Sequence, residues 1–380
     1  MKFFKRITNF YANWRNNLVS STRFQNWVSG VPLIRNMVTK DGEQLYDLVA
    51  GFVYSQTLLA LVELGVFSKL RSGMLNAQFL AMELNISIHR LSTLCQAGVA
   101  IKVLTRVDVE GQHYPNYRLS RLGAALLGVP GLQEMIKHHR LFYADLLDPV
   151  SLLKNQTKTR LSEYWPYVSG ENQGDDIDLE ISATYSNLMK SSQQLVADET
   201  LRVFDFGGVK SLLDVGGGTG AFITRVVQRH QQIRASLFDL PKVIEQARKL
   251  KSSEQSKAVI SFYSGNFLVD PLPSDVDAIS LIRVLYDHND DVVKNLLSKV
   301  FDVLPPGGMV LISEPMSGGV RPNKSGDAYF GFYTMAMTTG RPRDVPTHKM
   351  NLSQIGFQNI KTYSGTRNFI TSVITARKPF

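Results

Sequence analysis

The chain has 380 residues, of which 44% are hydrophobic, 20% charged and 10% aromatic. This length suits two domains, and this composition supports packed cores and excludes a largely disordered chain. The single cysteine, Cys95, excludes a disulfide framework, a cysteine zinc cluster and an iron–sulfur centre, and favours a reducing compartment such as the cytoplasm. No uncharged apolar run reaches the roughly 20 residues of a membrane span, and the first residues lack a secretory signal pattern. We therefore expect a globular protein without a bound metal.

The positive charge is concentrated at the N-terminus. The formal net charge is +9, and residues 1–40 contain seven basic side chains and no acidic one. Phe3, Ile7, Phe10, Trp14 and Leu18 recur at steps of three and four, which predicts an amphipathic helix. Such a helix is typical of an anionic membrane surface, but its apolar stripe could equally pack on the domain or on a dimer partner. We interpret residues 1–43 as a basic amphipathic arm and leave both partners open.

Residues 44–200 are predicted to form a mostly helical domain. Residues 44–70 are strongly apolar at helical spacing, and we expect this helix to be buried on most sides. A polar stretch around residues 170–176 is predicted to be an exposed loop. The short elements between them follow the order of a winged helix, with helices at 76–84 and 89–99 and β-like runs at 103–107 and 117–119.

The pattern changes after residue 200. Short apolar runs now alternate with helical patterns, which is typical of buried parallel strands, and these runs lie at 212–215, 235–238, 259–262, 279–282 and 309–312. We therefore expect residues 201–380 to form a doubly wound, Rossmann-like α/β domain. Two final β-like runs, at 356–360 and 369–374, predict a terminal antiparallel hairpin inserted into the sheet.

A glycine-rich loop follows the first of these strands. Residues 214–220 read DVGGGTG, and Gly216, Gly218 and Gly220 would let the backbone approach a ligand at the start of a helix. The next strand ends at Asp239, whose carboxylate can accept hydrogen bonds from ribose hydroxyls. The glycine spacing differs from that of pyrophosphate binders, so it disfavours a nicotinamide dehydrogenase and favours a ligand without phosphate, commonly S-adenosylmethionine. A glycine turn without any ligand is the structural alternative.

Further motifs follow in order, namely FDLP at 238–241, GNF at 265–267, RVLYDH at 283–288 and RPR at 341–343. Together with the glycine loop they resemble the class I S-adenosylmethionine-dependent O-methyltransferases that carry an N-terminal winged-helix dimerisation domain. The resemblance implies S-adenosylmethionine as cofactor and a homodimer. It also implies a set of cofactor-binding residues, which are Asp214, Gly216, Gly218, Gly220, Asp239, Leu240, Gly265, Asn266, Phe267 and Arg283.

The chain departs from this family at the catalytic positions. The family's histidine base and its two positioning glutamates correspond here to Tyr286, Glu314 and Pro342. A tyrosine with a pKa of about 10 is a poor base at neutral pH, so we expect Tyr286 to orient the acceptor or bind its hydroxyl. His288 could reach the acceptor only if its loop bends. We predict catalytic roles for Tyr286, His288 and Glu314, with His139 as the alternative base.

Three longer stretches, residues 45–56, 284–288 and 327–333, resemble one subgroup of this family. That subgroup is the carotenoid 1-hydroxyl O-methyltransferases of purple phototrophic bacteria, which act on demethylspheroidene or hydroxyneurosporene. The similarity covers nearly the whole chain from about residue 25, and it implies methyl transfer to the tertiary 1-hydroxyl of an acyclic carotenoid. The predicted substrate contacts are His139, Tyr329, Phe332, Tyr333 and Met335. Core packing of the aromatic stretch, and a surface position for the pair His138 and His139, are the structural alternatives.

A carotenoid dissolves in membranes, so the basic arm and the resemblance together predict a cytoplasmic protein peripheral on the inner or photosynthetic membrane. Three other functions stay open: a C-methyltransferase of a bacteriochlorophyll precursor, an O-methyltransferase of another apolar hydroxyl compound, and a winged-helix transcriptional regulator. The regulator is disfavoured because residues 89–103 contain only Arg90, Gln96 and Lys102 of the types that contact DNA. We therefore expect no nucleic-acid partner.

Overall fold

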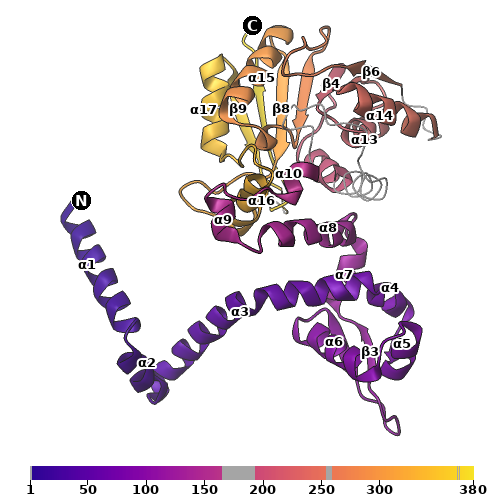
Figure 1. Ribbon diagram of the computed structural model, residues 1–380. Helices are drawn as coiled ribbons and strands as arrows, with labels where there is room; N and C mark the ends of the chain where they lie inside the picture. Colours follow the sequence, from indigo (N-terminus) through magenta and orange to yellow (C-terminus); the bar gives the residue numbers. More distant parts are fainter. Residues whose placement is uncertain (1, 165–192, 254–258, 366, 368) are drawn as a thin grey trace. The chain divides into compact units, whose positions relative to one another are not determined.

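The structure is a computed structural model that describes residues 2–164, 193–253, 259–365, 367 and 369–380 (Figure 1). The stretch predicted as a loop around residues 170–176 lies outside these ranges. The chain divides into two compact units, Met1–Ala124 and Ala125–Phe380. The sequence pattern predicts this boundary near residue 200, and the observed position differs. The reason is that α8 (Leu132–Asp145) packs within the second unit, where Phe142 shares a buried apolar cluster with Tyr333 and Ala336.

The N-terminal unit begins with three helices, α1 (Lys2–Val19), α2 (Thr22–Ser29) and α3 (Pro32–Glu63). The helix predicted from the arm's apolar spacing is therefore present as α1. Along it, Phe10 and Trp14 are 72% and 54% exposed. The predicted break between arm and domain at residue 43 is absent, because α3 continues through it without interruption.

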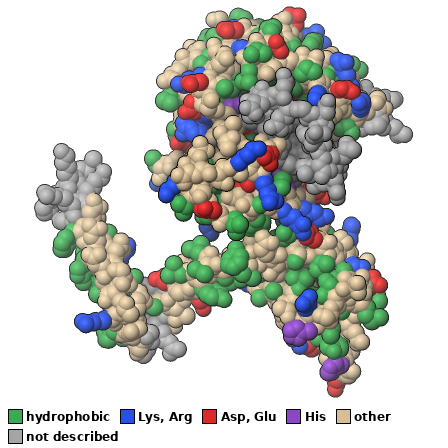
Figure 2. Space-filling model, in the orientation of Figure 1, with side chains coloured by type: hydrophobic (Ala, Val, Ile, Leu, Met, Phe, Trp, Pro, Cys, Tyr) green, Lys and Arg blue, Asp and Glu red, His purple; other side chains and the backbone are tan. Residues whose placement is uncertain are grey.

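The prediction that the apolar helix after residue 44 is buried on most sides is wrong for its first half. Leu45, Leu48 and Phe52 are 64%, 77% and 67% exposed, whereas Leu61 and Val62, in the last turn of α3, are buried. Figure 2 shows apolar side chains gathered along this helix. The apolar residues in this half of the helix therefore form a face that the rest of the unit does not cover. The sequence pattern predicts an apolar face, but it does not identify what packs against that face.

One helical stretch in the described part of the chain, Val38–Glu63 of α3, is long and apolar enough to cross a membrane by length and composition alone. The sequence-based exclusion of such a stretch was too strict, because it considered only uncharged runs. The same criterion is met by core helices of soluble proteins, so it carries little weight by itself.

The remainder of this unit confirms the winged helix. Helix α5 (Ala77–Glu83) begins at Asn76, whose side chain accepts a hydrogen bond from the Gln78 backbone N–H. Helix α6 (Ile88–Ala100) follows and buries Leu91 and Cys95 in the unit's own core. A three-stranded antiparallel sheet completes it, in the order β1 (Leu75–Asn76), β3 (Asn116–Leu119), β2 (Leu104–Val107). The small helices of this unit are α4 (Val66–Lys69), η1 (Leu70–Ser72) and α7 (Arg121–Gly128), the last extending past the unit's end.

The C-terminal unit contains a seven-stranded sheet in the order β6-β5-β4-β7-β8-β10-β9. Strands β4 to β8 are parallel, and β10 pairs antiparallel with both β8 and β9. The predicted terminal hairpin is therefore confirmed as β9 and β10, with β10 inserted beside β8. The strands are β4 (Ser211–Val215), β5 (Arg234–Asp239), β6 (Ile260–Ser264), β7 (Ala278–Ile282), β8 (Met309–Glu314), β9 (Gln358–Tyr363) and β10 (Ser372–Arg377).

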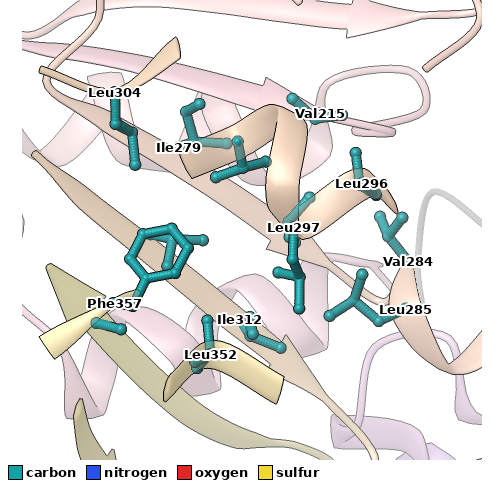
Figure 3. Close-up of a cluster of buried hydrophobic side chains, with 14 of the residues drawn as sticks. Val215, Ile279, Val284, Leu285, Leu296, Leu297, Leu304, Ile312, Leu352 and Phe357 are labelled. Carbon is teal, nitrogen blue, oxygen red and sulfur yellow. The ribbon is translucent and has the colours of Figure 1, made fainter. Parts of the chain in front are cut away.

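Helices cover both faces of this sheet, as a doubly wound fold requires. Alternate residues of one strand point to opposite faces, so Leu213 joins the cluster beneath α15 (Asp290–Val303) and α17 (Val345–Ile355), while Leu212 joins the cluster beneath α13 (Ala221–Arg229) and α14 (Pro241–Ser253). Figure 3 shows part of the first cluster, in which side chains of α15, α17 and the sheet meet. Both clusters are buried, which explains why the strands read as unbroken apolar runs.

A group of helices packs together in the C-terminal unit. It includes α8, α9 (Pro149–Leu153), α10 (Arg160–Tyr164), the π-helical segment η3 (Lys324–Phe330) and α16 (Gly331–Ala336). Asp145 at the end of α8 accepts hydrogen bonds from the first N–H groups of α10, at Arg160 (2.6 Å) and Leu161 (2.9 Å). An apolar cluster that contains Phe142 and Tyr333 joins these helices.

Candidate active site

The glycine loop takes backbone conformations that only glycine adopts without strain. Gly216, Gly218 and Gly220 have φ angles of 67°, 61° and 85°, in the left-handed region. At Gly217 a Cβ atom would meet the Asp214 carboxylate and the Leu237 side chain. The turn between β4 and α13 therefore requires the glycines of this motif. Because these residues have no side chains, the loop exposes its backbone at the carboxyl ends of the parallel strands.

Asp239 ties this loop to the end of the neighbouring strand. Its carboxylate accepts hydrogen bonds from the backbone N–H of Gly218 (2.8 Å) and from that of Leu240 (2.7 Å). Burial raises the pKa of Asp239 to about 6, against the opposing effect of these two hydrogen bonds. The carboxylate thus lies at the crevice beside β4, where such folds bind nucleotides.

Asp214 is fully buried at the start of the loop. Its Oδ1 accepts a hydrogen bond from the Ser280 hydroxyl (2.6 Å), whereas its Oδ2 has no hydrogen-bond partner among the described residues. Burial raises the pKa of Asp214 to about 7. A buried carboxylate with an unused oxygen suits a cationic ligand, and S-adenosylmethionine carries a sulfonium and an ammonium group. The residues of the loop therefore fit that cofactor.

The GNF segment closes the same crevice. A Cβ atom at Gly265 would lie 2.7 Å from the Phe238 ring, so glycine is needed there. The Asn266 side-chain oxygen accepts a hydrogen bond from the Leu268 N–H (2.9 Å). This oxygen therefore binds the backbone of its own loop and does not point to an adenine. The Phe267 ring meets the His288 ring edge to face, with centroids 5.3 Å apart. Burial, then the Arg343 charge, lowers the pKa of His288 to about 4.

The loop after β7 lies directly against the glycine loop. Val284 occupies the space beside Gly216, since a Cβ atom there would be 2.9 Å from Val284 Cγ2. Arg283 adopts a positive φ of 55°, and its guanidinium donates a hydrogen bond to the Tyr286 hydroxyl (3.0 Å). Tyr286 is 2% exposed, and burial raises its pKa above the ordinary value. This agrees with the expectation that Tyr286 is a poor base.

Glu314 positions the backbone of this loop and does not reach toward open space. Its Oε2 accepts hydrogen bonds from the N–H groups of Leu285 (3.0 Å) and Tyr286 (3.1 Å). Its Oε1 lies 3.2 Å from His348 Nε2, and both side chains are fully buried. The sequence gives no separate signal for His348, because a single histidine on a helix has no pattern.

Arg343 fixes the other side of the same loop. It is 1% exposed, and it donates hydrogen bonds to the carbonyls of Leu285 and His288 (2.8 Å each) and to Asp290 Oδ1 (2.7 Å). The sequence analysis identifies the RPR segment as a motif. Only the structure shows that its second arginine, Arg343, is buried and donates hydrogen bonds to backbone carbonyls of the loop.

Two histidines on α8 pair with two tyrosines of the aromatic stretch. His138 Nε2 lies 2.8 Å from the Tyr333 hydroxyl, and His139 Nε2 lies 2.8 Å from the Tyr329 hydroxyl. The interpretation of this pair as surface histidines is therefore wrong, because His138 is 6% exposed and His139 is half-buried. Burial lowers the pKa of both histidines to about 4.

The predicted substrate residues are not all brought together. Tyr333 lies in the buried apolar cluster, and Tyr329 and Phe332 border it. Met335 is 37% exposed and takes no part in that cluster. The Phe330 ring packs on Tyr286 (5.9 Å between centroids) and on Tyr329 (4.9 Å), so Tyr329 adjoins the loop after β7.

Comparisons with known proteins agree with this geometry. A family model described as an O-methyltransferase domain matches residues 143–358, and one described as an O-methyltransferase dimerisation domain matches residues 46–128. The demethylspheroidene O-methyltransferase of Cereibacter sphaeroides is 44% identical over 362 residues, which are 95% of this chain and 94% of that protein. The demethylspheroidene O-methyltransferase of Rhodobacter capsulatus is 40% identical over 97% of this chain and 90% of that protein. Human N-acetylserotonin methyltransferase, solved with S-adenosylmethionine, has a TM-score of 0.74 at 24% identity, covering 90% of this chain and 98% of that one.

Proposed function

Because this chain belongs to the O-methyltransferase family with an N-terminal dimerisation domain, we propose that it methylates the tertiary 1-hydroxyl of an acyclic carotenoid, with S-adenosylmethionine as the methyl donor. The observation that carries the substrate is the 44% identity, over 95% of the chain, to a demethylspheroidene O-methyltransferase. The predicted cofactor agrees with the family and with the donor set at the glycine loop.

When bound, S-adenosylmethionine supplies an activated methyl group on a sulfonium sulfur. The glycine loop lets its backbone approach the ligand, Asp239 is placed to accept hydrogen bonds from ribose hydroxyls, and Asp214 supplies negative charge beside the loop. The loop after β7 adjoins this site at Gly216 and adjoins Tyr329 through the ring of Phe330. Much of the rate enhancement then comes from alignment of donor and acceptor and from exclusion of water.

The acceptor side of the site suits an apolar molecule with one polar end. Tyr329 and Phe332 are half-buried and supply aromatic surface, and the ring of Tyr329 packs on the buried Phe142 with 5.9 Å between centroids. The Tyr329 hydroxyl and the His139 ring, whose Nε2 lies 2.8 Å from it, are polar groups in this surface. This combination of apolar walls and few polar groups is typical of sites for apolar ligands.

The dimerisation domain supports a homodimer. Within its matched residues exposed apolar side chains of α3 form a continuous stripe, made of Leu48, Val49, Phe52 and Val53. A stripe of this kind is costly in water, and a second copy of the chain would bury it.

The basic arm supports attachment to a membrane from the cytoplasmic side. Helix α1 exposes Phe10, Tyr11 and Trp14, and it lies outside the residues matched by the dimerisation domain. Each cation near an anionic surface contributes about 1 kcal/mol before screening, so the arm's cations are sufficient for peripheral attachment. Such attachment would bring the protein to the membrane in which a carotenoid is dissolved.

Pigment analysis after co-expression tests the proposed function. Cells that make a 1-hydroxylated acyclic carotenoid should accumulate its methyl ether when they also make this protein, as seen by mass spectrometry. Unchanged carotenoids together with a newly methylated bacteriochlorophyll precursor would favour the C-methyltransferase instead.

A further inference from the structure

Two similar hydrogen bonds join α8 to the aromatic stretch, but they differ in their surroundings. Tyr333 is 6% exposed and belongs to the buried apolar cluster. Its partner His138 is also 6% exposed. Tyr329 and His139 are half-buried. Of the two pairs, only the second can therefore border a bound acceptor without a rearrangement of the core.

Tyr329 also lies on the side of the loop after β7. Its ring packs edge to face on Phe330 (4.9 Å between centroids), and Phe330 packs in the same way on Tyr286 (5.9 Å). Tyr329 belongs to the π-helical segment η3, whose last residue is Phe330. Single π-helical turns often occur at functional sites, because the wider turn changes the direction of the side chains that follow.

We propose that the Tyr329 hydroxyl and the His139 imidazole form the path by which the acceptor's hydroxyl proton leaves. This proposal rests on the proposed methylation of an alcohol. It assigns the base function, which the family places at the position of Tyr286, to a pair of residues on two other elements.

The proton path balances the reaction. A lone pair of the acceptor oxygen forms the new O–C bond while the bond from carbon to sulfur breaks, which leaves neutral S-adenosylhomocysteine. The acceptor proton passes to the Tyr329 oxygen, and the Tyr329 proton passes to His139 Nε2 across the observed 2.8 Å. An oxygen that is gaining a methyl group becomes strongly acidic, so a weak base is sufficient to take the proton. Burial keeps His139 neutral at neutral pH, with a pKa of about 4, and therefore able to accept it.

Tyr286 cannot take the same role in this geometry. Its oxygen already accepts a hydrogen bond from the Arg283 guanidinium, and a cation at 3.0 Å makes that oxygen less basic. Tyr286 is also 2% exposed, so its hydroxyl is better suited to hold the acceptor side of the site in place.

The first test compares matched variants in single-turnover assays at saturating S-adenosylmethionine. Tyr329→Phe and His139→Gln should each lower the rate constant by about 100-fold, while S-adenosylmethionine affinity by calorimetry and the carotenoid KM change by less than about threefold. Tyr333→Phe and His138→Gln remove the equivalent hydrogen bond of the buried pair and report the purely structural effect. Equal losses in both pairs, or no loss in Tyr329→Phe, would overturn the proposal.

The second test does not depend on the carotenoid. ¹⁵N NMR of histidine-labelled protein with S-adenosylhomocysteine, assigned with His139→Gln, reports which ring nitrogen of His139 carries the proton. The path requires a proton on Nδ1 and an unprotonated Nε2. A proton on Nε2 would overturn the path even if the methylation of the carotenoid is correct. Conversely, wild-type protein that fails to methylate the carotenoid contradicts the proposed function alone.

Discussion

The Asp239 carboxylate accepts a hydrogen bond of 2.8 Å from the backbone N–H of Gly218, which fixes the glycine loop against the end of the neighbouring strand. One side chain thus holds the loop, and we propose that it also binds the cofactor's ribose. We expect Asp239→Ala to weaken S-adenosylmethionine binding strongly and Asp239→Asn to weaken it less, since an amide keeps one acceptor oxygen. Calorimetry at neutral pH checks this order, and equal affinities in all three proteins would contradict the assignment.

The pH dependence of cofactor binding follows from the same residue. The pKa of Asp239 is raised to about 6, so its carboxylate is charged above that pH and becomes protonated below it. Wild-type affinity for S-adenosylmethionine should therefore fall as the pH drops through 6. Asp239→Asn cannot titrate, and its affinity should fall less over the same range. Parallel curves for the two proteins would show that another group controls binding.

Gly218 offers a test of the loop's conformation. Its φ of 61° disfavours any residue with a Cβ atom, and that atom would lie 3.0 Å from the Gln193 side chain, which can move. Gly218→Ala should therefore lower the free energy of unfolding by about 1 kcal/mol. Gly218→Val should in addition abolish cofactor binding, because its side chain extends to the backbone that the ligand approaches. Thermal denaturation measures the first effect and calorimetry the second; unchanged affinity in Gly218→Val would place the ligand elsewhere.

We predict that Glu314 positions the backbone of the loop after β7 and does not contact the acceptor. Glu314→Ala leaves the N–H groups of Leu285 and Tyr286 buried without a partner, at a cost of about 1–3 kcal/mol each. We expect a large loss of stability from denaturant unfolding. Glu314→Gln keeps an oxygen for one or both N–H groups and should retain most of the turnover number. A turnover number that falls in Glu314→Gln as far as in Tyr329→Phe would instead indicate a direct role in catalysis.

The two buried histidines are predicted to make a destabilising contribution in acid. The pKa of His138 and His139 is about 4 in the folded protein and about 6.5 in an unfolded chain, so between these values protons bind preferentially to the unfolded state. The stability that these two residues contribute should fall as the pH falls from about 6.5 to about 4, whereas Asp214 and Asp239, whose pKa values are raised by burial, contribute with the opposite sign.

The double variant His138→Gln/His139→Gln isolates this effect in chemical denaturation. The wild type should lose stability relative to this variant as the pH falls from about 6.5 to about 4, because Asp214 and Asp239 titrate in both proteins and cancel in the comparison. Identical slopes would mean that the two imidazoles are solvated in the folded protein.

The arm is tested with anionic liposomes. Full-length protein should sediment with them at low salt and leave them at high salt, and Trp14→Ala and Phe10→Ala should weaken this attachment because both side chains are exposed on α1. Leu45→Ala on α3 is the matched control for an exposed apolar residue outside α1. Full-length protein that ignores liposomes at every salt concentration would assign the stripe of α1 to a protein partner.

Much of the fold could be predicted because its signals are local. The buried strands are continuous apolar runs, and the DVGGGTG motif needs positive φ angles that Gly216 and Gly218 supply. The exposure of Leu48 could not be predicted, since an apolar residue on a helix signals burial whether the partner is the same chain or another.

The site could be predicted only in part, for a related reason. The ends of β4 and β5 meet by the rules of parallel sheets, so Asp214 and Asp239 were found. The pairing of His139 with Tyr329 joins residues 190 positions apart and leaves no pattern in either segment. The hydrogen bond from Arg343 to the Leu285 carbonyl also joins distant parts of the chain and leaves no sequence pattern.

The most direct measurement uses purified protein, a 1-hydroxylated acyclic carotenoid in anionic liposomes, and S-adenosylmethionine with a deuterated methyl group. Mass spectrometry and NMR of the extracted pigment then locate the label. The account predicts a carotenoid methyl ether that carries the intact deuterated methyl group on the tertiary oxygen. A label bound to carbon, or an unlabelled carotenoid in an assay in which the protein binds S-adenosylmethionine, would contradict it.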